Sequence, residues 1–250
     1  MLAVIGGSGL TGLSQMRVNR RQIVRTPYGD PSGPLVIGHI GAMPALFLPR
    51  HGPGHVFAPH RVNYRANIWA LRESGATAIV AVGAVGGIGD DCAPGAVVAP
   101  AQIIDYTWGR EHTYVDGSER GVTHVDFTHP YSATLRALLL QAAQTAGVAA
   151  IDGGVYAATQ GPRLESAAEI ERLRRDGATL VGMTGMPEAA LARELALDYV
   201  HLCVVSNWAA GRGDSVQTVS HNGIETTLDH AIERVQRIIR ALADALHRAA

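Results

Sequence analysis

The chain has 250 residues, which is enough for one large α/β domain with a substantial core. It carries 21 basic and 22 acidic residues, and this near-neutral balance argues against a nucleic acid or an anionic membrane as its main partner. Every basic residue is Arg, so chemistry that depends on a P-loop or Schiff-base lysine is excluded.

Short apolar runs alternate with helical periods along the chain. The runs predict strands over Leu2–Ile5, Leu35–Ile40, Ala45–Leu48, Ala78–Val82, Val97–Ile104, Thr179–Gly182 and Tyr199–Val205. The periods predict helices over Arg61–Glu73, Ser132–Ala146, Glu165–Arg175, Pro187–Glu194 and Ile224–Arg248. We therefore expect one α/β domain over residues 1–250, with a mixed sheet and helical layers on both of its faces.

The stretch IGGSGLTG follows the first predicted strand, over residues 5–12, and contains the G-x-G-x-x-G spacing of dinucleotide sites. Such a site needs a helix directly after the glycines and an acidic residue about twenty positions further on. Residues 13–25 show no amphipathic helix, and the nearest acid is Asp30, in a turn. The context argues against NAD or FAD, and a dinucleotide-dependent oxidoreductase stays only as an alternative.

Three further stretches carry groups that suit an anion. Arg50 and His51 offer a guanidinium fork and an imidazole after a strand, and residues 83–87 form a Gly-rich segment that admits backbone N–H groups. Thr184 precedes a helix opened by Pro187, where the helix dipole favours negative charge. Each stretch also has an ordinary explanation, namely a surface loop, a tight turn or a helix cap.

The metal-binding residue types are not arranged as a metal site. Cys92 and Cys203 lie in separate apolar surroundings, which predicts buried reduced thiols. His51, His55 and His60 have neither helical spacing nor an accompanying carboxylate or thiol, so we predict no zinc site. The sequence also has no signal-peptide pattern and no long apolar span, so we expect a cytoplasmic protein.

Two polar residues in the second half of the chain are candidates for ligand contact. Asn207 ends a buried strand, where α/β folds commonly bind ligands, although an Asn there also caps turns. Glu165 opens a predicted helix, where an acid is commonly structural. The chain has no G-x-S-x-G, H-E-x-x-H or C-x-x-C motif, so hydrolase templates find no support.

Six stretches occur in a specific order and spacing: GGSGL (6–10), RHG (50–52), VNYRANIWAL (62–71), QGPRLE (160–165), GMTGMPEAALARE (182–194) and SN (206–207). In this set the chain resembles the purine nucleoside phosphorylase superfamily, above all its methylthioadenosine phosphorylase branch and the methylthioinosine relatives. The resemblance covers nearly the whole chain. It implies a partly barrel-like mixed sheet flanked by helices, a homotrimer, and no metal or organic cofactor.

The resemblance also implies a reaction and a set of site residues. The reaction is phosphorolysis, in which phosphate attacks C1′ of the sugar while the purine leaves. The residues that the resemblance assigns to phosphate are Ser8, Arg50, His51, Ala84 through its backbone, and Thr184. Those that it assigns to the nucleoside are Met183, Asn207, Trp208 and Ala209, with Asn207 as the catalytic residue at the base.

The base position departs from the methylthioadenosine branch, which has aspartates at positions 207 and 209 and a serine at 165. Asn207 can donate to O6 of a 6-oxopurine and accept from a protonated N7. An ionised Glu165 accepts from N1–H but faces the lone pair of adenine N1. We therefore expect hypoxanthine- or guanine-type bases, a preference that agrees with the methylthioinosine relatives.

The sequence leaves the 5′ end of the sugar open between two substrates. Val219 could line a methylthio pocket. His221 lies near the sequence position at which inosine and guanosine enzymes have a histidine for the 5′-hydroxyl. His124 resembles a residue that reaches the 5′ pocket of the neighbouring subunit. We expect S-methyl-5′-thioinosine first, giving hypoxanthine and 5-methylthioribose 1-phosphate. Inosine or guanosine phosphorolysis and non-catalytic nucleoside binding are the alternatives.

Overall fold

The computed structural model describes residues 1–115, 117, 121–219 and 224–249. Its strands are β1 (Leu2–Gly6), β2 (Met16–Gln22), β3 (Leu35–Ile40), β4 (Met43–Pro49), β5 (Ala78–Gly87), β6 (Val97–Ala99), β7 (Gln102–Asp105), β8 (Ile151–Asp152), β9 (Val155–Ala158), β10 (Leu180–Gly182) and β11 (Asp198–Trp208). Its α-helices are α1 (Tyr64–Glu73), α2 (Ala133–Thr145), α3 (Ala167–Arg175), α4 (Glu188–Glu194) and α5 (Ile224–Arg248). Short 3₁₀ turns cover Pro59–Arg61 and Gly213–Ser215.

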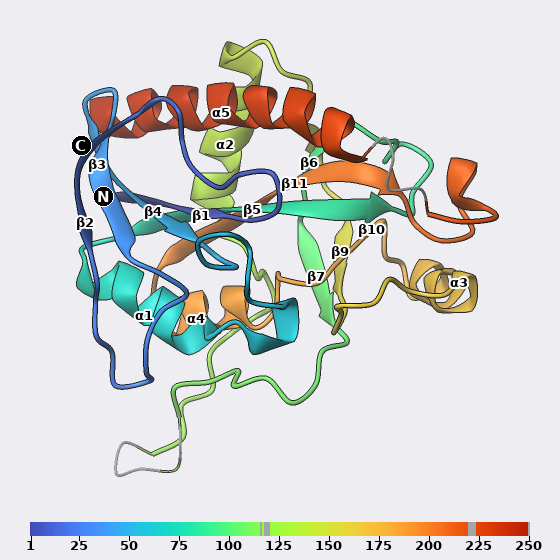
Figure 1. The fold of residues 1–250 in the computed structure, drawn as a ribbon, viewed down its shortest axis with the longest axis horizontal. Helices are drawn as coiled ribbons and strands as arrows, with labels where there is room; N and C mark the ends of the chain where they lie inside the picture. The colour runs from blue at the N-terminus through green and yellow to red at the C-terminus, as the bar shows by residue number, and fades with distance from the viewer. Residues whose placement is uncertain (116, 118–120, 220–223, 250) are drawn as a thin grey trace.

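The strands form one mixed sheet that branches at the long strand β5 (Figure 1). Strand β5 pairs in parallel with β1 on one side and β11 on the other, and its last residues pair antiparallel with β10. One path of the sheet runs β2-β3-β4-β1-β5-β10-β9-β7, and β11, β6 and β8 leave it at β5. The predicted mixed α/β class is therefore confirmed.

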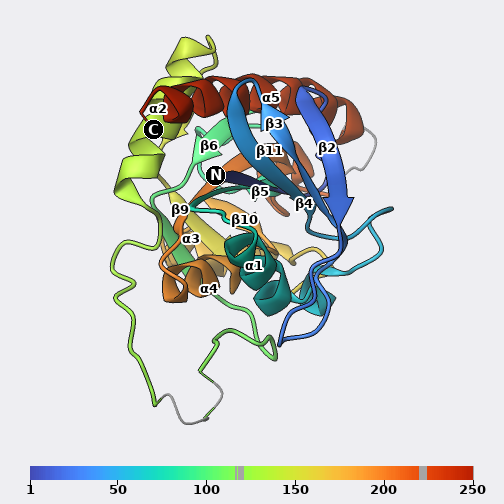
Figure 2. The same cartoon turned by 90° about the vertical axis from the view of Figure 1, so that its left-hand side faces the viewer.

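Helices cover both faces of the sheet, with α2 and α5 on one face and α1 and α4 on the other (Figures 1 and 2). Alternation along the strands explains the two layers, because successive side chains of a strand point to opposite faces. In β1, Leu2 and Val4 pack in the core beneath α2 and α5, whereas Ala3 and Ile5 pack in the core beneath α1 and α4. The buried strands are thus apolar on both sides, as the sequence predicts.

Local signals in the sequence set the helix boundaries. The side chain of Ser132 caps α2, and Ser166 forms a reciprocal capping box with Glu169 at the start of α3. The prediction that a helix begins at Glu165 is wrong, because this capping box places the start two residues later. The long apolar stripe of α5 is confirmed as one helix.

Strand β2 was not predicted, because its sequence lacks an apolar face. Of its residues only Met16 is buried, and the others are exposed at the edge of the sheet. Its conformation is set by antiparallel pairing with β3 rather than by its own residues. The expectation that no helix follows the glycine loop is confirmed, since β2 is the next element.

Two predictions for the middle of the chain are wrong in detail. The single strand expected over 97–104 is two strands, β6 and β7, which separate at Pro100 and pair with different neighbours. The turn expected at 83–87 is instead the continuation of β5, because β11 and β10 pair with it there. Glycine is required at Gly87, since a Cβ atom would lie 1.9 Å from the carbonyl oxygen of Cys92.

The topology brings the carboxyl ends of several strands together. Strands β1, β4, β5 and β11 run parallel, so the residues after β1 and β4 lie beside the second half of β5 and the end of β11. This is where α/β folds commonly bind ligands. Among the described residues no helix is both long and apolar enough to cross a membrane.

Candidate active site

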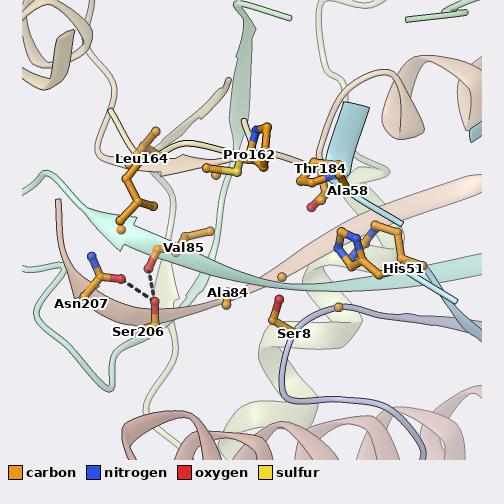
Figure 3. Close-up of a pocket in the computed structure, with 18 of the residues that line it drawn as sticks. Ser8, His51, Ala58, Ala84, Val85, Pro162, Leu164, Thr184, Ser206 and Asn207 are labelled. Carbon is orange, nitrogen blue, oxygen red and sulfur yellow. Dashed lines mark hydrogen bonds between the residues drawn. The ribbon is translucent and has the colours of Figure 1, made fainter. Parts of the chain in front are cut away.

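A cavity of about 460 Å³ lies at these strand ends (Figure 3). It brings together ten of the residues singled out in the sequence: Ser8, Arg50, His51, Ala84, Glu165, Met183, Thr184, Asn207, Ala209 and Val219. Figure 3 shows Asn207 and Leu164 at one end of the cavity and Ser8, His51 and Thr184 at the other. The cavity is therefore polar at both ends.

Two of the singled-out residues lie elsewhere. Trp208 is not among the described residues that line the cavity. Its indole packs instead against Gly213, where a Cβ atom, if one were present, would lie 2.4 Å from the ring. Substrate binding by Trp208 stays a prediction. His124 is exposed on the segment between β7 and α2 and is also outside the described lining. His221 lies outside the described residues.

Arg50 follows β4 and is completely buried, so the ordinary explanation of a surface loop is wrong for it. Its Nε and Nη2 atoms donate to the two carboxylate oxygens of Glu188 at 2.8 Å each, and Nη1 donates to the Val82 carbonyl at 2.8 Å. Tyr199 also donates to Glu188 at 2.8 Å. Burial lowers the pKa of Arg50, but the Glu188 carboxylate outweighs it, so the pKa is raised overall.

These bonds leave part of the Arg50 guanidinium free for a ligand. A guanidinium has five N–H groups, and the three bonds leave one N–H on each terminal nitrogen. The Glu188 carboxylate offsets the positive charge of Arg50, so the pair has no net charge. The guanidinium can still bind a ligand through its two free N–H groups, whose direction the ion pair fixes.

His51 is buried beside Arg50, and its Nδ1 atom lies 2.7 Å from the carbonyl oxygen of Phe57. The ring stacks on His55, with 4.3 Å between the centroids. Burial lowers the pKa of His51 to about 4, and the positive charge of Arg50 adds to the effect. The imidazole is therefore neutral near neutral pH.

The amide of Asn207 is oriented by its chain neighbours at the other end of the cavity. Ser206 Oγ donates to Asn207 Oδ1 at 2.7 Å (Figure 3), and Asn207 Nδ2 donates to the Trp208 carbonyl at 2.7 Å. One N–H and one oxygen lone pair of the amide then stay available to a ligand. The alternative role as a simple turn cap does not account for this orientation.

Glu165 lies just before α3, and Ser166 and Glu169 perform the capping. Its carboxylate accepts a hydrogen bond of 2.6 Å from the hydroxyl of Thr159. Glu165 also lines the cavity, so its remaining oxygen positions are available there. The structural explanation of an acid at a helix N-terminus is thus wrong for this residue.

Arg110 is buried and holds together segments that line the cavity. Its guanidinium donates to the carbonyl oxygens of Met183 at 2.9 Å, Thr159 at 3.1 Å and Gln160 at 2.9 Å. It also donates to the Met186 carbonyl at 2.6 Å, and all of these acceptors are uncharged. The guanidinium thereby ties the backbone at Met183 and Met186 to that at Thr159 and Gln160.

Sequence reasoning missed several residues that build the site. Arg110 and Glu188 lie inside stretches that looked ordinary, and only their burial marks them as polar groups that need partners. His55 lines the cavity from a loop that was considered only for metal binding. The two cysteines are free and buried, as predicted.

The chain belongs to the phosphorylase superfamily, whose family model matches residues 1–244. This confirms the family and the enzyme class expected from the sequence. A probable S-methyl-5′-thioinosine phosphorylase of Xanthomonas campestris pv. campestris is 50% identical, over 97% of this chain and 96% of its own length.

Two further relatives extend the comparison. A 6-oxopurine nucleoside phosphorylase of Pyrococcus furiosus is 41% identical, over 96% of this chain and 91% of its own. The crystal structure of methylthioadenosine phosphorylase from Schistosoma mansoni in complex with adenine has a TM-score of 0.93 and 31% identity. That match covers 100% of this chain and 92% of the other.

Proposed function

We propose that the chain catalyses the phosphorolysis of S-methyl-5′-thioinosine to hypoxanthine and 5-methylthioribose 1-phosphate. The observation that carries this proposal is the single cavity with Asn207 at one end and Ser8, His51 and Thr184 at the other (Figure 3). A base bound at the first end and a phosphate at the second leave the sugar between them. The names of relatives that are 49–50% identical support the substrate.

At the phosphate end, we assign the anion to a set of donors with little net charge. The donors are the hydroxyls of Ser8 and Thr184, the backbone at Ala84, and the free N–H groups of Arg50, with His51 beside them. One phosphate oxygen forms a bond to C1′ as the C1′–N9 bond breaks and its electron pair leaves with the purine. The proton lost by monohydrogen phosphate balances the one that the purine takes up.

At the base end, we assign recognition of the purine to Asn207 and Glu165, and stabilisation of the negative charge that builds on it to the amide of Asn207. The free N–H of Asn207 donates to O6, and its oxygen accepts from a protonated N7. The Glu165 carboxylate accepts from N1–H while Thr159 holds it from the other side. One preorganised donor at such a site contributes about 3–4 kcal/mol. Met183 and Ala209 also line the cavity.

At the 5′ end, Val219 lines the cavity and supports an apolar methylthio group. The Pyrococcus furiosus relative, a 6-oxopurine nucleoside phosphorylase, supports inosine or guanosine as the second candidate. A 5′-hydroxyl beside an apolar wall loses hydrogen bonds to water, so we rank methylthioinosine first.

Rates on four nucleosides, each with and without phosphate, test the function. We expect methylthioinosine to react fastest and only with phosphate, followed by inosine and guanosine, with methylthioadenosine slowest. Absence of phosphate-dependent turnover of the three 6-oxopurine nucleosides by folded protein would refute the proposal. Nucleoside binding without turnover would identify a non-catalytic relative instead.

We also propose a homotrimer, in which His124 of one subunit reaches the 5′ end of the next subunit's cavity. The exposure of His124, away from the cavity of its own chain, supports this assignment. Residues 1–250 are assigned to one domain, since strands from both halves of the chain share one sheet. The two free buried thiols support a cytoplasmic location.

A further inference from the structure

Arg110 joins two stretches of chain that contribute to the cavity from different strands. One stretch follows β9 and begins with Thr159 and Gln160, whose carbonyl oxygens accept hydrogen bonds from Nη2 at 3.1 and 2.9 Å. The other follows β10 and begins with Met183, whose carbonyl oxygen accepts from Nη1 at 2.9 Å. Nε also donates to the side-chain oxygen of Gln160 at 3.2 Å. Because a guanidinium is planar and its N–H groups have fixed directions, Arg110 sets how the two stretches lie relative to one another.

The stretch after β9 leads from Arg110 to the acid at the base end. Thr159, whose carbonyl oxygen Arg110 binds, donates through its hydroxyl to the Glu165 carboxylate at 2.6 Å. The backbone N–H of Thr159 donates to the Gly182 carbonyl at 2.8 Å. The position of the Glu165 carboxylate in the cavity therefore depends on a backbone segment that Arg110 holds.

The stretch after β10 contains a peptide unit that is held at both ends. The carbonyl oxygen of Met183 and the N–H of Thr184 belong to the same planar peptide. Arg110 donates to the oxygen, and the hydroxyl of Tyr156 accepts from the N–H at 3.2 Å. Met183 lines the cavity and is one of the residues expected to contact the nucleoside, so its backbone has little freedom to shift there.

Stability alone does not explain a charged residue at this position. Arg110 is buried, and none of the ion pairs within the described structure includes it. The other buried arginine of the site, Arg50, has the Glu188 carboxylate as its partner. Burial of a cation without an opposite charge is unfavourable. The arrangement suits a residue that is retained for the geometry its hydrogen bonds impose.

We propose that Arg110 is a positioning residue for base recognition: it fixes Glu165 relative to the backbone at Met183 and thereby sets how strongly the cavity prefers a 6-oxopurine to a 6-aminopurine. The inference rests on the proposed function, because it takes the base end of the cavity from there. None of the hydrogen bonds of Arg110 within the described structure goes to Arg50 or His51. Recognition of the base should therefore depend on Arg110, whereas phosphate binding should not.

Calorimetric titration of the full chain and of Arg110→Lys with hypoxanthine, adenine and phosphate tests the proposal. Lysine keeps the charge, but its single nitrogen cannot replace three guanidinium nitrogens that bind both stretches. We expect hypoxanthine to bind roughly 10- to 100-fold more weakly, because a misplacement of about 1 Å has effects of this size. The ratio of the adenine to the hypoxanthine dissociation constant should fall at least roughly tenfold, and the phosphate constant should stay within about threefold.

Arg136→Lys is the matched control. Arg136 also donates to two backbone carbonyl oxygens, those of Ala99 at 2.9 Å and Pro100 at 3.1 Å, but it is outside the described lining of the cavity. Its dissociation constants for the three ligands should stay near those of the unchanged chain. Equal weakening of hypoxanthine and phosphate in Arg110→Lys, or an unchanged ratio of the two bases, would overturn the proposal.

A second variant decides if Arg110→Lys does not fold. Arg110→Ala removes the buried charge, and free guanidinium ion can occupy the space that the side chain leaves. We expect added guanidinium to restore the preference for hypoxanthine over adenine, with sodium at the same ionic strength as the control; failure to restore it would contradict the proposal. These binding constants do not depend on turnover. A chain that binds the bases as expected but does not react would therefore remove the proposed function and leave the role of Arg110 intact.

Discussion

Glu165 and Asn207 present opposite hydrogen-bonding groups to the base end of the cavity. The bonds from Ser206 and Thr159 leave each of them with a defined free group. A 6-aminopurine reverses the pattern at N1 and at the 6 position, so it meets a mismatch at both residues. We therefore attribute the proposed base preference to two side chains and not to the fold, which the adenine-bound Schistosoma mansoni structure shares.

The double variant Asn207→Asp with Glu165→Ser tests this base preference. We expect kcat/KM for methylthioinosine to fall at least roughly 30-fold and that for methylthioadenosine to rise, since each of the two mismatches is worth about 1–3 kcal/mol. Steady-state rates on both nucleosides measure the change, and Asn207→Asp alone serves as the control. A wild-type chain that already prefers methylthioadenosine would contradict the base assignment.

His201 is a buried residue whose contribution to stability depends on pH. It lies in β11 beside Tyr156, and neither ring nitrogen has a hydrogen-bond partner within the described structure. Burial lowers the pKa of His201 to about 3, with a smaller effect of Arg50. In the unfolded chain His201 therefore takes up a proton near pH 6.5, whereas in the folded chain it stays neutral at that pH. The free energy of unfolding consequently falls as the pH drops below about 6.5.

The variant His201→Leu isolates this effect. The histidine should cost the folded state about 2 kcal/mol between about pH 7 and about pH 5, and the variant should lose less stability over that interval by this amount. Urea unfolding at both pH values measures the difference. His51 also has a lowered pKa, so some acid sensitivity should persist in the variant. Equal loss in both proteins would mean that His201 is protonated when folded.

Between elements, the ion pair of Arg50 and Glu188 ties the end of β4 to the start of α4. Both side chains are fully buried, so removing one partner leaves a charge without compensation. Glu188→Leu should lower the free energy of unfolding by about 3–5 kcal/mol. The double variant Arg50→Met with Glu188→Leu should recover most of that loss while abolishing phosphate binding. Denaturant unfolding and phosphate titration provide the two readouts; a stable single variant would contradict this account.

Elements with strong periodicity could be predicted from the sequence, and elements made by their neighbours could not. The stripe of α5 and the apolar run of β1 are local patterns, and both predictions are confirmed. Strand β2 exists because β3 pairs with it, and residues 83–87 stay extended because β10 and β11 flank them. Pairing across the sheet is a tertiary effect that a single stretch does not reveal.

The site shows the same division. Ser8 and Thr184 follow strands and Asn207 lies at the end of one, so their convergence could be predicted from the rule that sites lie at carboxyl strand ends. Arg110 could not, because it comes from the irregular segment between β7 and α2 and reaches four backbone carbonyls that only the folded chain assembles. The same holds for the pairing of Glu188 with Arg50 across 138 residues.

At the scale of the whole molecule, the segment between β7 and α2 runs out beyond α1 and α4 (Figures 1 and 2). It carries large apolar side chains that face solvent in the single chain, Trp108 at 73% exposure and Val122 at 72%. Apolar residues gathered on a projecting segment commonly mark a protein interface. His124 lies between Val122 and Val125, another exposed apolar residue, in the sequence, which links the proposed assembly to the proposed 5′ site.

Replacing two of these residues should therefore separate assembly from folding. In Val122→Asp with Val125→Asp, two charges enter the proposed interface, so we expect the trimer to dissociate at micromolar concentrations while each chain keeps its melting behaviour. We also expect KM for methylthioinosine to rise more than kcat falls, because the partner's contribution at the 5′ end is lost. Light scattering measures the mass, and Val18→Asp, at an exposed position on β2, is the matched control. A chain that is monomeric and fully active before any substitution would contradict the assembly and would assign the 5′ pocket to residues of one chain alone.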